Sequence, residues 1–404
     1  MASYKVNAVV GQSGGPTSAI NATLCGVILG ASASQEIDTL YGMENGITGL
    51  IEDKLFSLNY LFGQNKALCR LALTPACVLG SARYRLPNDF GSSVYESIFD
   101  NLLKRDIKYF FFIGGNDSMD TVSRLNAYAL YNGIDISFVG IPKTIDNDLV
   151  LTDHTPGYGS CAKYVATVAC ELACDVSVYR EPSVTFLEVM GRQAGWLGCA
   201  CALPKYYFGK GADLVYVPEG DFSNDKMLCD IENELSRKNN LLVAVSEGVS
   251  SLDFSETDAF GHSKSGGISR ELSSFVKEKL GCKSRGIELN IPQRCAGHLV
   301  SRVDISESLY IGKRAVYMAA HGVSGKMVAF ARKTGAFGVT AVGVDLCKVA
   351  NKVKKVPKAF LDSKRAFVTK ECIEYISPLV KGEIGLEYYG GLPNYFFRES
   401  KTDV

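Results

Sequence analysis

The chain has 404 residues, which suggests two or three domains or two lobes of one enzyme. Its 43 lysines and arginines balance 43 aspartates and glutamates, and the absence of a basic excess argues against electrostatic binding to nucleic acid or to a membrane surface. Hydrophobic residues make up 47% and charged residues 21%, so the chain can fill a sizeable core, and the composition excludes a disordered protein.

We expect a cytoplasmic protein that does not enter a membrane. No apolar run reaches the roughly 18 residues of a membrane-spanning helix, and the N-terminal MASYKVNAVVGQSGG lacks the apolar core and the cleavage site of a signal peptide. The thirteen cysteines are scattered and odd in number, and no spacing between them completes a zinc site. We therefore interpret them as reduced thiols that pack as small hydrophobic side chains.

Strands and helices alternate along the chain, a pattern typical of an α/β protein with a largely parallel sheet. A strand over 6–10 runs into a glycine turn and a helix. A strand over 108–115 precedes a helix for which Ser118 is the predicted N-cap. The Ser/Gly-rich segment 251–267 is predicted to be a mobile loop. Further strands are predicted over 136–142, 183–190, 213–220, 241–248 and 285–291, the last of which closes the series before helical segments.

Polar motifs follow the ends of these strands, at the edge where open α/β sheets bind ligands. GQSGGPTSAIN (11–21) lies between a strand and a helix, and its glycine N–H groups and the helix N-terminus suit an anion. By itself it is equally compatible with an ordinary tight turn, because it lacks the ending of a P-loop. IGGNDSM (113–119) repeats the arrangement, and here Asp117 either caps the following helix or repels a phosphate group.

PKTIDND (142–148) is the most informative stretch. Two aspartates, two residues apart, lie beside a lysine in a loop that leaves a buried strand. An ionised aspartate there can accept a proton from a hydroxyl nucleophile, and Lys143 can neutralise charge on a phosphoryl group during transfer. The alternative is an Asp-rich turn without a chemical role.

Arginines and a glutamate accumulate at other predicted strand ends and turns, where each one alone could be a surface charge. The planar guanidinium group suits phosphate, and glutamate suits sugar hydroxyl groups. In a chain of zero net charge, this set indicates a site for two phosphate groups: Arg83, Arg192, Glu247, Arg285 and Arg294.

GQSGGPTSAIN, GGNDSM, PKTIDND, MGRQAGW and IELNIPQR together resemble the motifs of the phosphofructokinase family, and within it the pyrophosphate-dependent branch. They occur in the family order from residue 6 to about residue 345. The resemblance implies two similar Rossmann-like α/β/α lobes with mostly parallel sheets and an active site in the cleft between them. Residues 1–158 with 295–342 would bind the phosphoryl donor. Residues 159–294 with 343–404 would form the fructose 6-phosphate lobe with a C-terminal extension.

The resemblance implies transfer of a phosphoryl group from pyrophosphate to the 1-hydroxyl group of fructose 6-phosphate. Asp146 matches the proton acceptor, and Lys143 and Asp117 stand where ATP-using relatives carry small glycines. The other matches divide between the two substrates. Those for fructose 6-phosphate are Thr144, Ile145, Met190, Gly191, Arg192, Glu247, Arg285 and Arg294, one of the last two reaching across a subunit interface. Those for the donor phosphates are Gly11, Arg83, Gly115 and Ser118.

Mg²⁺ is the cofactor that the resemblance implies. Asn116 stands where the family usually has a magnesium-linked aspartate, and an amide is a weaker ligand than a carboxylate. Ser183 and Ile291 replace an arginine and a hydrogen-bonding residue of the family pattern. The resemblance also implies a homodimer or homotetramer that binds pyrophosphate and fructose 6-phosphate and no nucleic acid. Two alternatives stay open: an ATP-dependent phosphofructokinase and a non-catalytic, sugar-phosphate-binding regulatory subunit.

Overall fold

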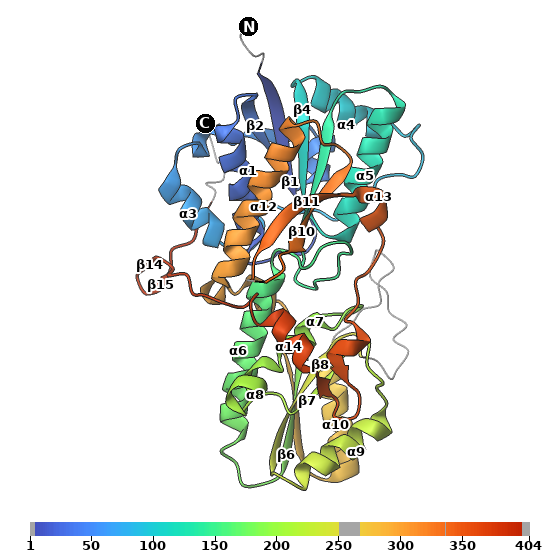
Figure 1. Ribbon diagram of the computed structural model, residues 1–404, viewed down its shortest axis with the longest axis vertical. Coiled ribbons are helices and arrows are strands. Elements are labelled where there is room, and N and C mark those ends of the chain that lie inside the picture. The colour runs from blue at the N-terminus through green and yellow to red at the C-terminus, as the bar shows by residue number, and fades with distance from the viewer. Residues whose placement is uncertain (1–4, 250–266, 336, 398–404) are drawn as a thin grey trace.

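Two β-sheets, each covered by helices on both faces, divide the chain into an upper and a lower lobe in Figure 1. This computed structural model describes residues 5–249, 267–335 and 337–397. Of the segment 251–267, predicted to be a mobile loop, only Gly267 belongs to these residues. The predicted α/β class with two mostly parallel sheets is confirmed, although the sheets differ in size, with seven strands in one and four in the other.

The larger sheet forms the first lobe, and its strands run parallel except for the two at its edges. Gln12 lies opposite Ile113 and Gly114 lies opposite Pro142, so three central strands end side by side. Across the sheet the order is β11 (Val339–Asp345), β10 (Lys326–Arg332), β5 (Ser137–Pro142), β4 (Ile107–Gly114), β1 (Val6–Gln12), β2 (Ile37–Met43) and β3 (Leu55–Ser57).

β4 shows why this sheet is buried on both faces. Its IKYFFFIG run places large apolar side chains on both sides, as a central parallel strand requires. Phe111 and Ile113 pack into one hydrophobic cluster, and Phe110 and Phe112 pack into another on the opposite face. The longest helices in these clusters are α1 (Ile20–Ala33) and α12 (Arg302–Ala320) on the first face, and α4 (Ser93–Leu103) and α5 (Asn116–Tyr131) on the second.

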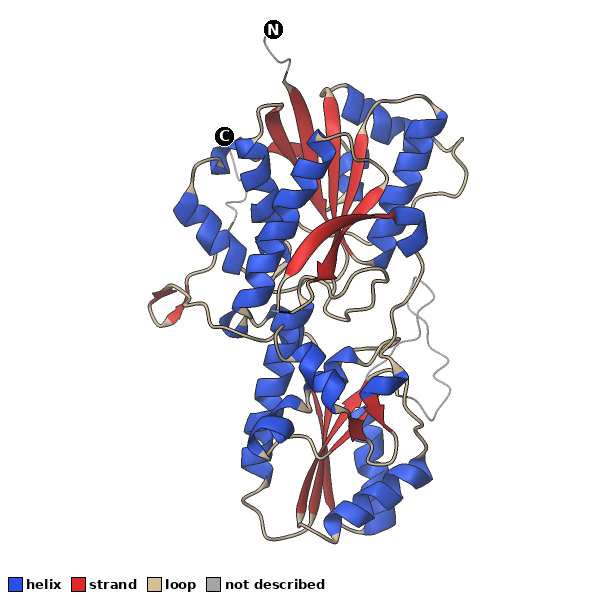
Figure 2. Ribbon diagram, viewed as in Figure 1, coloured by secondary structure: helices blue, strands red, loops and turns tan. Residues whose placement is uncertain are grey.

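The smaller sheet forms the second lobe and is parallel throughout. Its order is β7 (Leu214–Tyr216), β8 (Asn240–Ser246), β6 (Ser183–Val189) and β9 (Lys283–Glu288). One face packs against α6 (Tyr158–Val176), α7 (Trp196–Ala200), α8 (Leu203–Phe208) and α14 (Lys370–Ile376), and the other against α9 (Asn224–Leu235) and α10 (Ile268–Leu280). Figure 2 shows this layering of helices around strands in both lobes.

Three details of the predicted elements are wrong. The helix after β4 begins at Asn116 with Gly115 as its N-cap, so Ser118 lies inside the helix. The last predicted strand ends at Glu288, because the chain turns at Asn290, whose φ is 45°, into the short helix α11 (Pro292–Cys295). It does not close the series, because β10 and β11 follow. β11 is not among the predicted strands, because it is an edge strand and lacks an unbroken run of buried residues.

The C-terminal chain connects the lobes. It leaves the first lobe after α13 (Leu346–Val349), and α14 packs in the second lobe (Figure 1). The Phe396 N–H group then donates to Thr74 Oγ1 of the first lobe at 2.8 Å. Residues 343–397 therefore contact both lobes. No helix in the described part of the chain is long and apolar enough to span a membrane. The remaining short elements are α2 (Ile47–Ile51), η1 (Asn59–Leu61), α3 (Asn65–Leu73), η2 (Gly297–Leu299), α13 (Leu346–Val349), η3 (Lys358–Phe360), β12 (Leu361–Asp362), β13 (Phe367–Val368), β14 (Tyr388–Tyr389) and β15 (Leu392–Pro393).

Candidate active site

The ends of β1, β4 and β5 bring three predicted motifs together at one edge of the larger sheet. The backbone N–H group of Ser13 donates to Ile113 O at 2.9 Å, and that of Lys143 donates to Gly114 O at 2.9 Å. The glycine turn after β1, the GGN turn after β4 and the start of the PKTIDND loop are therefore hydrogen-bonded neighbours. The carboxyl ends of parallel strands are the edge at which such sheets bind ligands.

Two cations border the glycine turn. The Lys143 ammonium group donates to Gly15 O, and a side chain at Gly14 would come within 3.3 Å of Lys143 Nζ. A side chain at Gly15 would come within 3.2 Å of Arg294 Nη1. Gly14 also has a φ of 77°, which L side chains rarely adopt. Glycine at both positions therefore lets the backbone lie close to two positive charges, an arrangement that suits a phosphate group.

Gly11, the glycine predicted to contact the donor, lies inside β1. A side chain there would come within 2.6 Å of Met43 Cε and 2.9 Å of the Phe112 ring, so its small size accommodates core packing. Gly14 and Gly15, which lie in the same predicted motif, are the glycines beside the cations. In the sequence, Gly14 and Gly15 differ from Gly11 because they come after the end of the strand, where the backbone turns.

Two hydrogen bonds and one buried side chain hold the loop that carries Asp146. The Asp146 N–H group donates to Thr144 Oγ1 at 3.1 Å, and Thr144 O accepts from the Thr155 hydroxyl group at 2.8 Å. The side chain of Ile145 is 7% exposed and packs in the hydrophobic cluster of the second lobe. Ile145, predicted to contact substrate, therefore anchors the loop through its side chain and has only its backbone left for a ligand.

Charges from both lobes act on Asp146. Burial, followed by the negative charges of Asp148 and Glu247, raises the pKa of Asp146 to about 7 against the opposing effects of Arg192 and Lys143. Burial also lowers the pKa of the Lys143 ammonium group, which is 2% exposed. Glu247 and Arg192 belong to the second lobe, so the two lobes meet at this loop. A carboxyl group with a pKa near neutrality is suited to act as a general base.

The second lobe contributes a pocket at the carboxyl end of its sheet. Arg192 Nε lies 3.5 Å from Glu247 Oε1, and the Gly191 N–H group donates to the same oxygen at 3.4 Å. The Met190 N–H group donates to Gln293 Oε1 at 3.0 Å, which ties the MGR turn to the PQR segment. Burial raises the pKa of Glu247. The lining residues are Glu188, Val189, Met190, Glu247, Glu288, Asn290 and Gln293. Their carboxylate and amide oxygens suit sugar hydroxyl groups.

The two arginines predicted to bind the sugar 6-phosphate lie in different surroundings. Arg294 lies beside Gly15, and its Nε is buried with no hydrogen-bond partner in the described part of the chain. Arg285 is exposed in the first half of β9, an edge strand, where it lies opposite Thr185. The prediction that Arg285 lies at a strand end is therefore wrong, because β9 begins and ends earlier in the sequence than expected.

The residues after β4 form the first turn of α5. Asp117 is exposed, and Ser118 is buried with its Oγ 1.9 Å from where a side chain at Gly114 would begin. A carboxylate in the first turn of a helix is favourable whether or not it meets a ligand. Arg83 is also exposed, and Ser81 two residues before it donates from its hydroxyl group to Gly14 O at 2.9 Å. The segment around Arg83 thus adjoins the glycine turn.

Asn116 has one side-chain oxygen that fits a magnesium ion. Its Nδ2 donates to Lys352 O at 2.6 Å, whereas its Oδ1 is buried and lacks a hydrogen-bond partner among the described residues. Mg²⁺ commonly takes one or two protein oxygens together with phosphate oxygens and water. Residues 5–249, 267–335 and 337–397 include no group of three or more His, Cys, Asp or Glu placed to hold a metal ion without such help.

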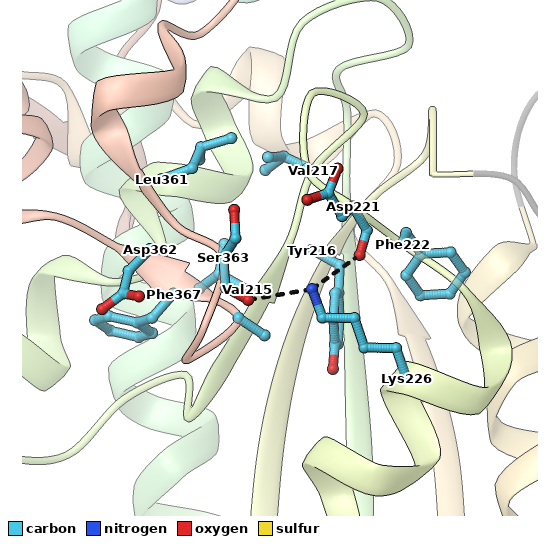
Figure 3. A pocket seen from close by; sticks show the side chains of 12 residues that line it. Val215, Tyr216, Val217, Asp221, Phe222, Lys226, Leu361, Asp362, Ser363 and Phe367 are labelled. Carbon is cyan, nitrogen blue, oxygen red and sulfur yellow. Dashed lines mark hydrogen bonds between the residues drawn. The ribbon is translucent and has the colours of Figure 1, made fainter.

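A separate pocket lies in the second lobe between β7, α9 and the β12–β13 hairpin (Figure 3). The Lys226 ammonium group points into it and donates to the backbone oxygens of Asp221 and Ser363 at 3.2 and 3.1 Å. The carboxylates of Asp221 and Asp362 also line it. Because its cation is already bound by backbone oxygens and no predicted site residue lines it, this pocket is a poor candidate for a phosphate ligand.

Comparison with known proteins reveals close relatives of this chain. The family description "Phosphofructokinase" matches residues 7–318. The chain is 35% identical over 398 residues to a pyrophosphate–fructose 6-phosphate 1-phosphotransferase from Halomonas elongata, covering 96% of this chain and 94% of the relative. It is 34% identical over 322 residues to a sulfofructose kinase from Alkalicoccus urumqiensis, covering 79% and 82%. Its structure is similar to the crystal structure of a pyrophosphate-dependent phosphofructokinase from Nitrosospira multiformis, with a TM-score of 0.88, 33% identity and coverage of 97% and 96% of the two chains.

Proposed function

Because the chain belongs to the phosphofructokinase family, we propose that its site transfers a phosphoryl group from pyrophosphate to the 1-hydroxyl group of fructose 6-phosphate. The products are fructose 1,6-bisphosphate and phosphate, and the transfer runs in both directions. The observation that carries this function is the position of Asp146, a carboxylate with a pKa of about 7 between the buried cation Lys143 and the Arg192–Glu247 pair of the opposite lobe.

The donor binds at the first lobe. Gly14 and Gly15 present backbone to the pyrophosphate, and Lys143 and Arg83 supply positive charge. Gly115, the N-cap of α5, and Ser118, in the first turn of that helix, lie beside it. Asn116 Oδ1 would be the protein ligand of the magnesium ion that is bound with pyrophosphate. When bound, that ion would neutralise charge on the phosphate groups. Residues 1–158 with 295–342 form this lobe in our proposal.

Fructose 6-phosphate binds at the second lobe. Glu247 and the backbone of the MGR turn face the sugar hydroxyl groups, and Arg192 supplies a guanidinium group for the sugar phosphate. Arg294 supplies a second one, and because it lies beside Gly15 it stands where the two substrates would adjoin. Residues 159–294 with 343–404 form this lobe in our proposal, apart from the end of β11, α13 and the segment at Phe396, which pack on the first lobe. Arg285 lies on an exposed edge strand, so we propose that it reaches the 6-phosphate of a neighbouring subunit in a homodimer or homotetramer.

The transfer rests on positioning and charge. Asp146 takes the proton of the 1-hydroxyl group as that oxygen attacks the near phosphorus of pyrophosphate in line, and phosphate leaves on the opposite side. Lys143 stabilises the charge that develops on the transferred group. Thr144 fixes Asp146 through its hydroxyl oxygen. The protein forms no covalent bond to the phosphoryl group.

Asp117 selects the donor in this proposal. It is exposed at the start of α5, where a nucleotide would extend beyond the two phosphates that Lys143 faces. A carboxylate there repels a third phosphate group and thereby disfavours ATP.

A coupled assay on the purified chain tests the function. We expect turnover of fructose 6-phosphate with Mg-pyrophosphate and about a hundredfold lower kcat/KM with Mg-ATP, because Asp117 repels the third phosphate group and the site is built for two. A preference for ATP would favour an ATP-dependent phosphofructokinase. No turnover with either donor, together with tight binding of fructose 6-phosphate, would favour a regulatory subunit.

A further inference from the structure

An extended segment after α13 crosses between the lobes and contacts two motifs of the first one. We call residues 351–357 the strap. Its Lys352 O accepts from Asn116 Nδ2 at 2.6 Å. Its Lys354 N–H group donates to Asp148 O at 2.7 Å. The strap backbone is therefore hydrogen-bonded both to the turn after β4 and to the loop that carries the proton acceptor.

The strap also holds the MGRQAGW turn of the second lobe. Trp196 Nε1 donates to Lys354 O at 3.0 Å. The Val356 N–H group donates to Glu219 Oε1 at 2.9 Å, and the Glu219 carboxylate accepts from the Gly195 N–H group at 3.1 Å. One short stretch of backbone thus connects the parts of the two lobes that must meet for transfer.

The Lys354 side chain turns back under the PKTIDND loop. Its ammonium group donates to Asn147 Oδ1 at 3.0 Å, to Thr152 O at 3.2 Å and to Asp153 O at 2.7 Å. An ammonium group has three N–H bonds, so these three acceptors satisfy it completely. The Trp196 ring, whose centroid lies 5.2 Å from Lys354 Nζ, covers it from the second lobe. The three contacts fix Lys354 in one place.

Asn147, the residue directly after Asp146, is held in an uncommon conformation. It is fully buried and has a φ of 53°. This value lies in the left-handed region, where any residue that carries a side chain is less stable. Besides the bond from Lys354, its Nδ2 donates to Tyr375 Oη at 2.9 Å, and the Tyr375 hydroxyl group donates to Asp153 O at 2.6 Å. The surrounding structure therefore sets this conformation, and with it the direction of the chain at Asp146.

We propose that Lys354 is a positioning residue for phosphoryl transfer, which holds Asp146 in its reactive place through Asn147 and keeps that loop in register with the MGRQAGW turn. The inference rests on the proposed function, because it assigns to Lys354 the orientation of the proton acceptor. Catalysis of this kind depends on geometry to about one ångström, and a loop displaced by that much loses rate about a hundredfold.

A lysine is a costly residue for this position, which supports a role beyond filling space. Burial lowers the pKa of Lys354 to about 7, although Asp153 and Asp148 oppose the shift. An apolar side chain of similar length would avoid that desolvation. It would also leave Asn147 Oδ1 and Thr152 O without the hydrogen bond from Lys354, and Asp153 O with the Tyr375 hydroxyl group alone.

Steady-state kinetics of Lys354→Met and Asn147→Gly tests the proposal. Glycine adopts the left-handed conformation freely, so Asn147→Gly removes the side-chain link while leaving the backbone conformation accessible. For each variant we expect kcat to fall about tenfold to a hundredfold, with the KM of both substrates within about threefold of wild type. Lys355→Met is the matched control, because its side chain is exposed one residue along the strap, and it should behave as wild type.

A double-mutant cycle separates positioning from mere structural support. If Lys354 acts through Asn147, the double variant should lose little more kcat than the worse single variant. Effects that multiply, or an unchanged kcat in Lys354→Met, would overturn the proposal. If Lys354→Met does not fold, Asn147→Gly and Tyr375→Phe must still lower kcat at constant KM, and unchanged rates in both would overturn it. Failure of the proposed function would be seen separately, as no turnover of pyrophosphate and fructose 6-phosphate by the wild-type chain.

Discussion

The pKa of Asp146 makes pH dependence an informative prediction. Burial, Asp148 and Glu247 raise this pKa to about 7, so the carboxylate that accepts the proton is fully formed only above that pH. About a tenth of the groups would be ionised at pH 6 and about a hundredth at pH 5, so kcat/KM should fall roughly tenfold for each pH unit below neutrality. An aspartate with an ordinary pKa near 3.9 would lose almost nothing over the same range.

The assay compares kcat/KM between pH 5 and pH 9 in the wild type and in Asp148→Asn. Phosphate groups of the substrates titrate near pH 6 in both cases, so the difference between the two proteins is the diagnostic quantity. Asp148 is the like charge with the largest effect on Asp146, and its removal should move the acid limb to lower pH. Asp135→Asn, whose carboxylate is 96% exposed before β5, should leave the profile unchanged. A limb that stays in place in Asp148→Asn would refute the reasoning.

Four further predictions concern single residues. Arg294→Ala should raise the fructose 6-phosphate KM more than tenfold and the pyrophosphate KM less, and the opposite order in steady-state kinetics would assign Arg294 to the donor. Lys143→Ala should lower pyrophosphate turnover roughly a hundredfold. Asp117→Gly should permit detectable use of ATP. An unchanged donor preference in Asp117→Gly, with ~1 kcal/mol lower stability, would mean that Asp117 only stabilises α5. Gly26→Ala should lower the free energy of unfolding by about 1–3 kcal/mol in thermal denaturation, because its methyl group would begin 2.2 Å from Leu309 O where α1 meets α12; wild-type stability would contradict that contact.

The central strands were predictable because their signal is local. β4 carries an unbroken run of buried aromatic and aliphatic residues, and both faces of a parallel sheet demand such a run. β11 carries no such signal, since it is an edge strand whose residues are exposed or half-buried and which pairs, among the described strands, with β10 alone. Its antiparallel pairing with β10, the strand just before it in the chain, decides its structure, and its mix of exposed and half-buried residues is too weak a signal to reveal that pairing.

The site residues, like the strands, were predictable only where their signal is local. The turns after β1, β4 and β5 were predictable because glycine, asparagine and aspartate at strand ends have a local physical meaning. Lys354 was not, because its partner Asn147 lies 207 residues away, and KKVPK resembles an ordinary solvated basic segment. Arg285 was misplaced because β9 begins with the polar run Lys283–Arg285, which carries no apolar signal, so the strand was expected two residues too late although Gly281 ends α10 just before it.

The kcat of Asp146→Asn with pyrophosphate and fructose 6-phosphate tests most directly whether Asp146 is the proton acceptor. The amide keeps the size of the side chain and removes only its ability to take a proton. We expect kcat to fall about 10²–10⁴-fold, with the fructose 6-phosphate KM within a few-fold of wild type, because the lost group acts on the proton of the 1-hydroxyl group and not on the bound phosphate. An Asp146→Asn protein that turns over at the wild-type rate would contradict the account.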